Sequence, residues 1–223
     1  MKTIVKICGV RTAYQARVAA EAGADMVGLV FAESKRRVTL EEARALTSAR
    51  YERRPRFAGV FVNEDPESIA RIAGAARLDL AQLSGSETPE ECARLRVPYV
   101  KVVHMRAGMT ARDVLHIANQ HQNAVAIMVD TAGLTPESRW GGSGVPVNWR
   151  LAAEIVRAMD KPVALAGGLR PDNVGEAIRI VRPWGVDVSS GVETDGVKDD
   201  EKIRAFVSAA KTALEELEGV ASS

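Results

Sequence analysis

The chain has 223 residues and a formal net charge of +1, from 30 lysines and arginines against 29 aspartates and glutamates, so strong attraction to nucleic acid or to an anionic membrane is excluded as its main mode of action. With 46% hydrophobic and 26% charged residues, the composition is that of a globular chain and excludes disorder as the main state. No export leader begins the sequence and no apolar stretch reaches the roughly 18 residues of a membrane span, so we expect a cytoplasmic protein.

Short apolar runs rich in β-branched residues alternate with longer amphipathic stretches along the whole chain. Nearly continuous hydrophobic runs of this length are typical of parallel strands buried on both faces. The predicted strands are residues 4–8, 25–31, 57–62, 78–83, 99–104, 124–129, 162–167 and 186–191. The predicted helices are residues 12–22, 40–49, 66–75, 89–96, 111–121, 149–159, 171–181 and 199–217, and the tail 215–223 is expected to fray.

Eight strand-then-helix units predict an α/β fold, a (β/α)8 TIM barrel with a closed parallel sheet in a single domain over residues 1–223. The alternative is an open doubly wound sheet, which normally shows Gly-x-Gly-x-x-Gly after its first strand. Cys8-Gly9-Val10-Arg11 stands there instead. The longest connection, residues 130–148, follows the sixth strand on the side of the barrel where such enzymes keep their active sites.

Glycine-rich turns lie at the ends of the last two predicted strands, at Gly167-Gly168 and at Ser190-Gly191. Glycines let backbone N–H groups approach a phosphate, and two such turns at these strand ends match the recurrent phosphate site of TIM barrels. The alternative is that these glycines only permit tight turns. Gly142 and Gly144, in the long connection, are predicted to add a further cluster of N–H groups.

Cys8 and Asp130 end the first and sixth predicted strands, so a barrel brings a thiol and a carboxyl to one mouth. A thiolate can remove a proton from carbon and a carboxyl of raised pKa can donate one to a leaving oxygen, so the pair suits proton transfer. Alternatively, Cys8 is a small buried residue and Asp130 caps a turn. Cys92, within a predicted helix, is interpreted as a packing residue.

Arg36 follows the second predicted strand in a cluster of basic residues. Its guanidinium can bind a substrate carboxylate through two hydrogen bonds. The alternative is that these basic side chains only face the solvent. Glu193 and Asp195 are left open between binding ribose hydroxyls and facing water. His104 is a lone histidine at a strand end, more often structural than catalytic. The histidines have no metal-ligand spacing, and two cysteines are too few for a zinc site, so we predict no metal.

The strand-end motifs together resemble the phosphoribosylanthranilate isomerase family of tryptophan biosynthesis. The similarity covers essentially the whole chain, and the first and last motifs, Lys-Ile-Cys-Gly and Asp-Val-Ser-Ser-Gly-Val-Glu, are the most specific. The motifs lie at residues 6–9, 28–31 with 34–38, 59–63, 82–87, 129–131, 141–144, 165–169 with 173–174, and 187–193 with 196 and 198–199.

This resemblance implies a barrel isomerase without metal or cofactor that converts N-(5-phosphoribosyl)anthranilate to 1-(2-carboxyphenylamino)-1-deoxyribulose 5-phosphate by an Amadori rearrangement. It implies that Asp130 is the general acid and Cys8 the general base. It also implies that Arg36 holds the anthranilate carboxylate, and that Gly168 and Ser190-Gly191 bind the phosphate. The expected partner is therefore a small phosphorylated substrate, and both a monomer and a homodimer fit such a barrel.

The sequence departs from the family pattern at three positions near the mouth. Lys35 stands where the family usually has proline, Ser84 where it has histidine, and Asn148 where it has aspartate. We expect the first two to alter substrate affinity or specificity, because one loosens the turn before Arg36 and the other removes an imidazole. The alternatives left open are an isomerase of a different phosphoribosyl aldosylamine and a non-catalytic barrel that binds a phosphorylated ligand.

Overall fold

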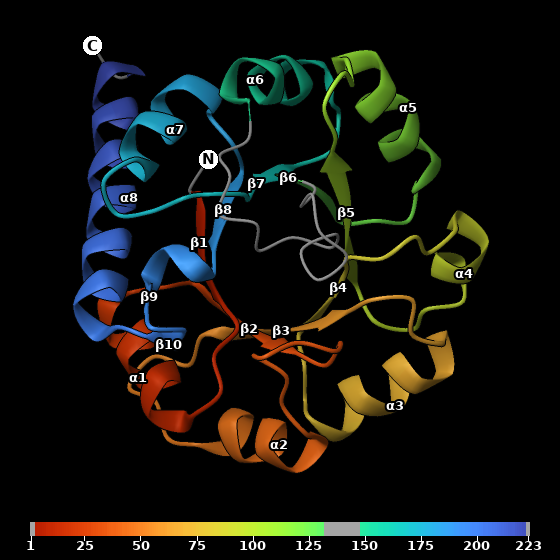
Figure 1. Cartoon of the computed structure of the whole chain (residues 1–223), viewed down its shortest axis with the longest axis vertical. Helices are drawn as coiled ribbons and strands as arrows, with labels where there is room; N and C mark the ends of the chain where they lie inside the picture. Colours follow the sequence, from red (N-terminus) through yellow and green to blue (C-terminus); the bar gives the residue numbers. More distant parts are fainter. Residues whose placement is uncertain (1–2, 132–147, 222–223) are drawn as a thin grey trace.

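The computed structural model describes residues 3–131 and 148–221, and it is a barrel of parallel strands surrounded by helices (Figure 1). Each strand is followed by a helix, and the helices form the outer ring (Figure 1). The strands are β1 (Ile4–Cys8), β2 (Met26–Val30), β3 (Arg56–Phe61), β4 (Leu80–Leu83), β5 (Tyr99–Met105), β6 (Ala126–Thr131), β7 (Val163–Leu165) and β8 (Gly185–Val188).

The sheet closes on itself because β1 pairs in parallel with both β2 and β8, and the order β1 to β8 follows the sequence. The predicted (β/α)8 barrel is therefore confirmed, and the open doubly wound sheet is excluded. Lys6 lies opposite Met26 on one side and Asp187 on the other, and His104 lies opposite Asp130. This register brings charged residues of neighbouring strands into contact inside the barrel.

The helices are α1 (Ala13–Ala22), α2 (Leu40–Ser48), α3 (Pro66–Ala75), α4 (Pro89–Ala93), α5 (Ala111–Gln120), α6 (Trp149–Ala158), α7 (Val174–Val181) and α8 (Asp200–Ala221). Local sequence fixes several of their starts: threonine and an acidic residue three positions later form capping boxes at Thr39, Thr88 and Thr110. Asn148 caps α6 by accepting from the N–H groups of Arg150 and Leu151. The asparagine that replaces the family's aspartate thus still starts this helix.

Hydrophobic packing occurs on both faces of the strands. The larger core lies between the strands and the helices, where Ile7, Leu29, Phe57 and Ile127 are fully buried. Inside the barrel a smaller apolar layer forms from β5, β6 and β7, and Cys8, Val30 and Val60 form another closer to the strand ends. Burial on both faces is why the strands read as continuous apolar runs.

Several segments differ from the expected bounds, among them the regions around β8, α7 and α8. β8 ends at Val188, and Ser190–Val192 forms the short 3-10 helix η2 instead of continuing the strand. α7 begins at Val174, after a turn closed by Asn173, whose side chain accepts from the Arg170 N–H and donates to the Gly168 carbonyl. α8 continues to Ala221, so the prediction of a frayed tail from residue 215 was wrong.

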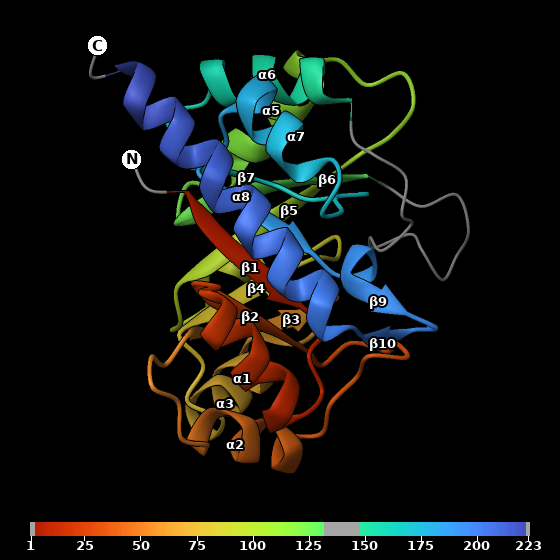
Figure 2. The same ribbon diagram turned by 90° about the vertical axis from the view of Figure 1, so that its left-hand side faces the viewer.

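A small antiparallel hairpin, β9 (Glu193–Thr194) and β10 (Val197–Lys198), stands between η2 and α8 (Figure 2).

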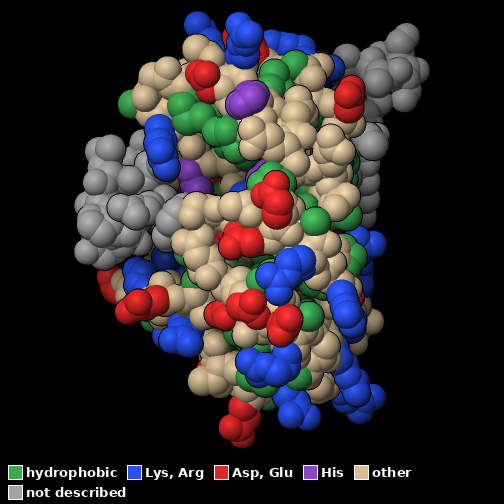
Figure 3. All heavy atoms as spheres, turned by 90° about the vertical axis from the view of Figure 1, so that its right-hand side faces the viewer, with side chains coloured by type: hydrophobic (Ala, Val, Ile, Leu, Met, Phe, Trp, Pro, Cys, Tyr) green, Lys and Arg blue, Asp and Glu red, His purple; other side chains and the backbone are tan. Residues whose placement is uncertain are grey.

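On the face over α3, α4 and α5, acidic and basic side chains are interspersed, without a field of one sign (Figure 3). In the described residues, no helix combines the length and the apolar character needed to cross a membrane.

Candidate active site

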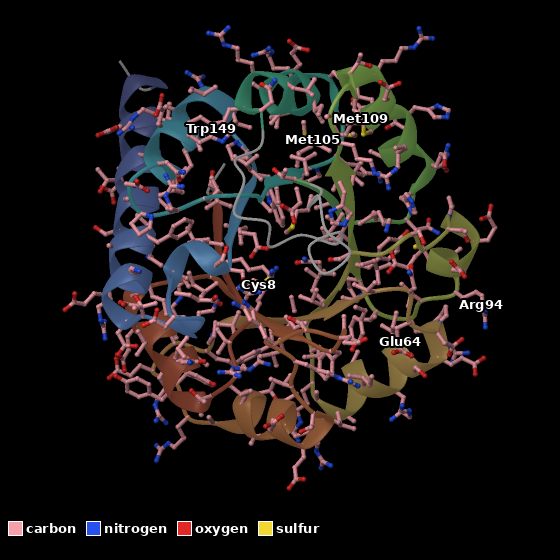
Figure 4. All side chains as sticks on the ribbon, viewed as in Figure 1. Cys8, Glu64, Arg94, Met105, Met109 and Trp149 are labelled. Atoms are coloured by element: carbon pink, nitrogen blue, oxygen red, sulfur yellow. The ribbon has the colours of Figure 1, made fainter. Side chains whose placement is uncertain are left out.

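The site lies at the mouth formed by the carboxyl ends of the strands. Cys8, the last residue of β1, lies near the centre of the ring of helices (Figure 4). Asp130, near the end of β6, lines one pocket with the turn after β7 and the turn after β8. The barrel therefore brings together the predicted site residues Asp130, Gly167-Gly168 and Ser190-Gly191, which are far apart in the sequence.

A buried ion pair lies beneath this mouth. Lys6 Nζ is 2.8 Å from Asp187 Oδ1, and the two side chains are only 5% and 9% exposed. The ammonium of Lys6 also acts on the Cys8 thiol, two residues along β1. Burial lowers the pKa of Lys6, but the charge of Asp187, the interaction with Cys8 and the hydrogen bond to Asp187 together outweigh it. The pKa is therefore raised and the amine stays charged.

The ion pair acts on the two predicted proton-transfer groups in different ways. Burial raises the pKa of the Cys8 thiol, and the positive charge of Lys6 opposes that rise by favouring the thiolate. Burial and then the negative charge of Asp187 raise the pKa of Asp130 to about 7, against a hydrogen bond from the Thr131 N–H. Asp130 is thus prepared to hold a proton near neutral pH.

The turn after β7 needs glycine at both positions. Gly167 and Gly168 have φ values of +88° and +63°, which L side chains rarely adopt. In the described part of the chain, the N–H groups of these two residues have no hydrogen-bond acceptor. Both glycines line the pocket that the Ser190-Gly191 turn also lines, as an anion site built from backbone donors requires.

The second turn depends on close backbone contact. A Cβ atom built on Gly191 would lie 1.9 Å from the carbonyl oxygen of Leu169, in the turn after β7. The absence of a side chain therefore lets the two turns touch. This contact is what brings the two sets of backbone donors to one pocket.

We therefore expect Gly191→Ala to push the turns apart and to lower the free energy of unfolding by about 2 kcal/mol, as overpacking does. Gly74→Ala is the matched control, because Gly74 lies within α3 and its added Cβ would meet no atom within 4 Å. That control should raise stability by up to about 1 kcal/mol, the helix-propensity difference. Urea unfolding of both variants measures this, and equal effects of the two substitutions would contradict the role given to Gly191.

Arg36 reaches the mouth from the connection after β2, but it is not a solvated charge. Its Nε and Nη2 donate to Oε1 and Oε2 of Glu193 at 2.6 and 2.8 Å. The sequence left open whether Glu193 faces water or binds ribose hydroxyls. In the structure its carboxylate pairs with Arg36 instead. Asp195, beside it in the hairpin turn, is exposed.

An imidazole lies at the β4 edge of the mouth although Ser84 replaces the family's histidine. His104, from β5, donates through Nε2 to the Ser84 carbonyl at 2.8 Å, a contact that fixes which ring nitrogen carries the proton. The Ser84 hydroxyl accepts from the Gln82 amide. Burial lowers the pKa of His104, so the ring is neutral near pH 7. The expected effect of Ser84 on substrate affinity or specificity stays a prediction, with the imidazole of His104 lying against the Ser84 backbone.

Two of the predicted site residues, Gly142 and Gly144, lie outside the described residues. Cys92 is buried in α4, where burial raises its pKa to about 11, in agreement with a packing role. Among the described residues, no three His, Cys, Asp or Glu side chains are grouped so that they could hold a metal ion. The expectation of no metal and no cofactor stays a prediction.

Sequence reasoning missed Lys6, Asp187 and Lys198. Lys6 and Asp187 interrupt strands that are otherwise apolar, and a charge in a strand buried on both faces must be paired. That signal was present in the sequence. Lys198 gave no such signal, because its burial depends on how the β9–β10 hairpin folds over the mouth.

The closed barrel, the paired glycine turns and the titratable groups at the strand ends are the features of a TIM-barrel enzyme. A family model described as N-(5'-phosphoribosyl)anthranilate (PRA) isomerase matches residues 5–209. The chain belongs to this family of isomerases, and the resemblance found from the strand-end motifs is confirmed.

Relatives support the assignment over nearly the full length. The chain is 48% identical to the N-(5'-phosphoribosyl)anthranilate isomerase of Roseiflexus sp. (strain RS-1), covering 95% of this chain and 99% of that protein. It is 41% identical to the enzyme of the same name from Dehalococcoides mccartyi, over 93% and 95% of the two chains.

Solved structures agree. The phosphoribosyl anthranilate isomerase of Thermotoga maritima superimposes with a TM-score of 0.82 at 39% identity, covering 95% of this chain and all of that one. A phosphoribosyl anthranilate isomerase in complex with reduced 1-(o-carboxyphenylamino)-1-deoxyribulose 5-phosphate gives a TM-score of 0.80 at 35% identity, with the same coverage.

Proposed function

We propose that this chain converts N-(5-phosphoribosyl)anthranilate to 1-(2-carboxyphenylamino)-1-deoxyribulose 5-phosphate, the isomerisation that its family performs in tryptophan biosynthesis. The observation that carries the proposal is the carboxyl of Asp130, whose pKa of about 7 suits a proton donor, in the same pocket as the two glycine turns. The Cys8 thiol lies at the end of β1 beside the Lys6–Asp187 ion pair.

In the first step, Asp130 acts as general acid. Its proton goes to the furanose ring oxygen, the bond between that oxygen and C1 breaks, and the nitrogen lone pair forms a C1–N double bond. The sugar opens to a protonated imine, and Asp130 becomes a carboxylate. Its raised pKa supports this role, because a carboxyl that is still protonated near pH 7 has a proton to deliver.

In the second step, Cys8 acts as general base. Its thiolate takes the proton from C2, the C–H electrons form a C1–C2 double bond, and the imine nitrogen accepts the displaced pair. The resulting enolamine becomes the ketone when the C2 hydroxyl loses a proton and C1 gains one. The substrate's own imine is the electron sink, and the ammonium of Lys6 stabilises the thiolate.

Binding is assigned to the groups around this pair. The backbone N–H groups of Gly167, Gly168 and the Ser190-Gly191 turn hold the phosphate, and Gly142 and Gly144 are proposed to add further donors. Arg36 holds the anthranilate carboxylate with the part of its guanidinium that Glu193 leaves available.

The test is turnover of freshly prepared N-(5-phosphoribosyl)anthranilate, followed by loss of the substrate's fluorescence. An isomerisation leaves the mass unchanged, so the product is identified by the ketone carbon signal of substrate labelled with 13C at C2. We expect decay in proportion to protein concentration, with the ketone as product, and none above the buffer rate with heat-denatured protein. A folded protein that leaves the substrate decaying at the buffer rate would refute this function.

A further inference from the structure

Three charged side chains pack together beside the mouth, and they come from two parts of the chain. Arg36 comes from the connection between β2 and α2, whereas Glu193 and Lys198 come from the β9–β10 hairpin. Lys198 Nζ is 2.7 Å from Glu193 Oε1, the oxygen that also accepts from Arg36 Nε at 2.6 Å. The side chains of Arg36, Glu193 and Lys198 are 13%, 5% and 1% exposed.

The hairpin holds this trio in a fixed geometry. Glu193 and Lys198 lie directly opposite each other in its register, and the turn between the strands has positive φ at Asp195 and Gly196, as a tight two-residue turn requires. Lys198 also donates to the Ser189 carbonyl at 2.9 Å, and Lys202 of α8 donates to the Glu193 carbonyl at 2.9 Å. The carboxylate of Glu193 therefore has little freedom to move.

The packing of Arg36 is equally close. A Cβ atom added at Gly9, just after Cys8, would lie 2.5 Å from Cδ of Arg36, so the arginine stem lies against the backbone that follows the proposed base. The connection that carries Arg36 runs beside the hairpin (Figures 1 and 2), and a Cβ on Gly196 would be 3.3 Å from Nζ of Lys35. Lys35 thus extends toward the hairpin turn from the position where the family has proline.

The trio contains two basic groups and one carboxylate. Burial would raise the pKa of Glu193, but hydrogen bonds from Arg36 and Lys198 outweigh it and lower the pKa to about 2, so this carboxylate is ionised at any physiological pH. Burial lowers the pKa of Lys198, against its hydrogen bond to Glu193. When Lys198 is protonated, two cations share this one carboxylate in a largely buried cluster. A buried net charge is costly unless it is paired, so the cluster favours an anion beside it.

The free edge of the guanidinium is the part of this cluster that can bind such an anion. Glu193 occupies Nε and one N–H of Nη2, and in the described residues Nη1 has no hydrogen-bond acceptor. An arginine donates five hydrogen bonds in a rigid plane, so fixing one edge of the plane also fixes the direction of the other. The remaining edge offers two parallel donors, which match a carboxylate.

We propose that Glu193 and Lys198 are positioning residues that aim Arg36 at the carboxylate of the substrate's aromatic ring. This inference rests on the proposed function and deepens it. Glu193 sets the plane of the guanidinium through its two hydrogen bonds, and Lys198 holds Glu193 in place. Specificity for a carboxylated aromatic amine thus depends on two residues that do not touch it.

The test is Glu193→Gln, assayed on two substrates. An amide has only one oxygen to accept from Arg36, and its NH2 group opposes the second donor, so the guanidinium loses its fixed orientation. We therefore expect the KM for N-(5-phosphoribosyl)anthranilate to rise about tenfold or more, while kcat changes less than about threefold. A tenfold change in affinity corresponds to about 1.4 kcal/mol. For the analogue with aniline in place of anthranilate, KM should change less than about twofold.

The direction of the change separates orientation from charge. Removing a negative charge beside Arg36 makes the cluster more positive, so an effect of charge alone would lower the KM for the carboxylated substrate. Glu33→Gln is the matched control, because Glu33 is exposed in the same connection as Arg36 and should leave both KM values unchanged. Far-UV circular dichroism verifies that the variants fold. The second variant is Glu193→Asp, which keeps the negative charge but is one methylene too short to keep both contacts with Arg36.

A double-mutant cycle completes the test. If Glu193 acts through Arg36, Glu193→Gln should have almost no further effect on KM in an Arg36→Ala background. An equal effect in both backgrounds, or an equal effect on both substrates, would overturn the inference. A wild-type protein that converts neither substrate overturns the proposed function and this inference together, whereas wild-type turnover with an unchanged KM in Glu193→Gln overturns this inference alone.

Discussion

Replacing Asp130 by asparagine is expected to lower kcat by about a thousandfold while making the protein more stable at neutral pH. Asparagine has the shape of the protonated carboxyl and can still accept the Thr131 N–H through its oxygen. It has no proton to give to the ring oxygen, and losing a general acid typically costs about 10²- to 10⁴-fold. The substrate should still bind, because the glycine turns and Arg36 are unchanged.

The stability change follows from the pKa of Asp130. Burial and Asp187 raise that pKa to about 7 in the folded protein, from about 3.8 in the unfolded chain. A carboxyl whose folded pKa is raised favours folding most below its unfolded pKa, and this contribution is lost as the pH rises through the folded pKa. The wild type therefore loses stability between about pH 4 and pH 7, on the order of 2 to 4 kcal/mol, and Asp130→Asn does not.

Urea unfolding at pH 4 and at pH 8 measures this difference. The variant should be more stable than the wild type at pH 8, and the two should approach each other at pH 4. Asp160→Asn is a suitable control, because Asp160 lies outside the mouth, in the α6–β7 connection, and should change neither kcat nor the pH dependence of stability. Equal stabilities of Asp130→Asn and wild type at pH 8 would show that the folded protein does not raise the pKa of this carboxyl.

The sequence predicted the barrel because each strand is buried on both faces and therefore reads as an apolar run, as at residues 57–61 and 126–129. It also predicted the mouth, since parallel strands in a closed barrel end on the same side. Cys8, Asp130 and the two glycine turns could be found from the residues at the carboxyl end of each strand. No contact between side chains was needed for that prediction.

The contacts between side chains could not be predicted in the same way. Whether Glu193 faces water or pairs with Arg36 depends on the direction in which a short hairpin folds, and two residues separated by 157 positions in sequence carry no local sign of their pairing. The imidazole of His104 at the Ser84 carbonyl likewise depends on the register between β4 and β5. A charged residue within an otherwise apolar strand, such as Lys6, was the only feature of the sequence that indicated a buried ion-pair partner.

Replacing Cys8 by serine is the second substitution expected to abolish turnover, with kcat lower by about a thousandfold or more. A serine hydroxyl fills nearly the same space, so the barrel should stay folded. Its proton is far harder to remove than that of a thiol, even beside the ammonium of Lys6, so no base is available to take the proton from C2. Cys92→Ser is the matched control, because this second buried cysteine lies in α4, and its kcat should stay within about twofold of wild type.

The pH dependence distinguishes a missing base from a damaged site. The wild type is productive when Cys8 is a thiolate and Asp130 carries a proton. The pKa of Cys8 is raised above the ordinary thiol value, and the pKa of Asp130 is raised to about 7. Below pH 7 the rate should rise tenfold per pH unit as thiolate forms; above pH 7 each gain in thiolate is offset by loss of the Asp130 proton, so the rate levels off. Residual activity in Cys8→Ser should lack the rise below pH 7 and instead fall above it, where only the loss of the acid remains. A variant that keeps the wild-type profile at near-normal rates would show that another group is the base.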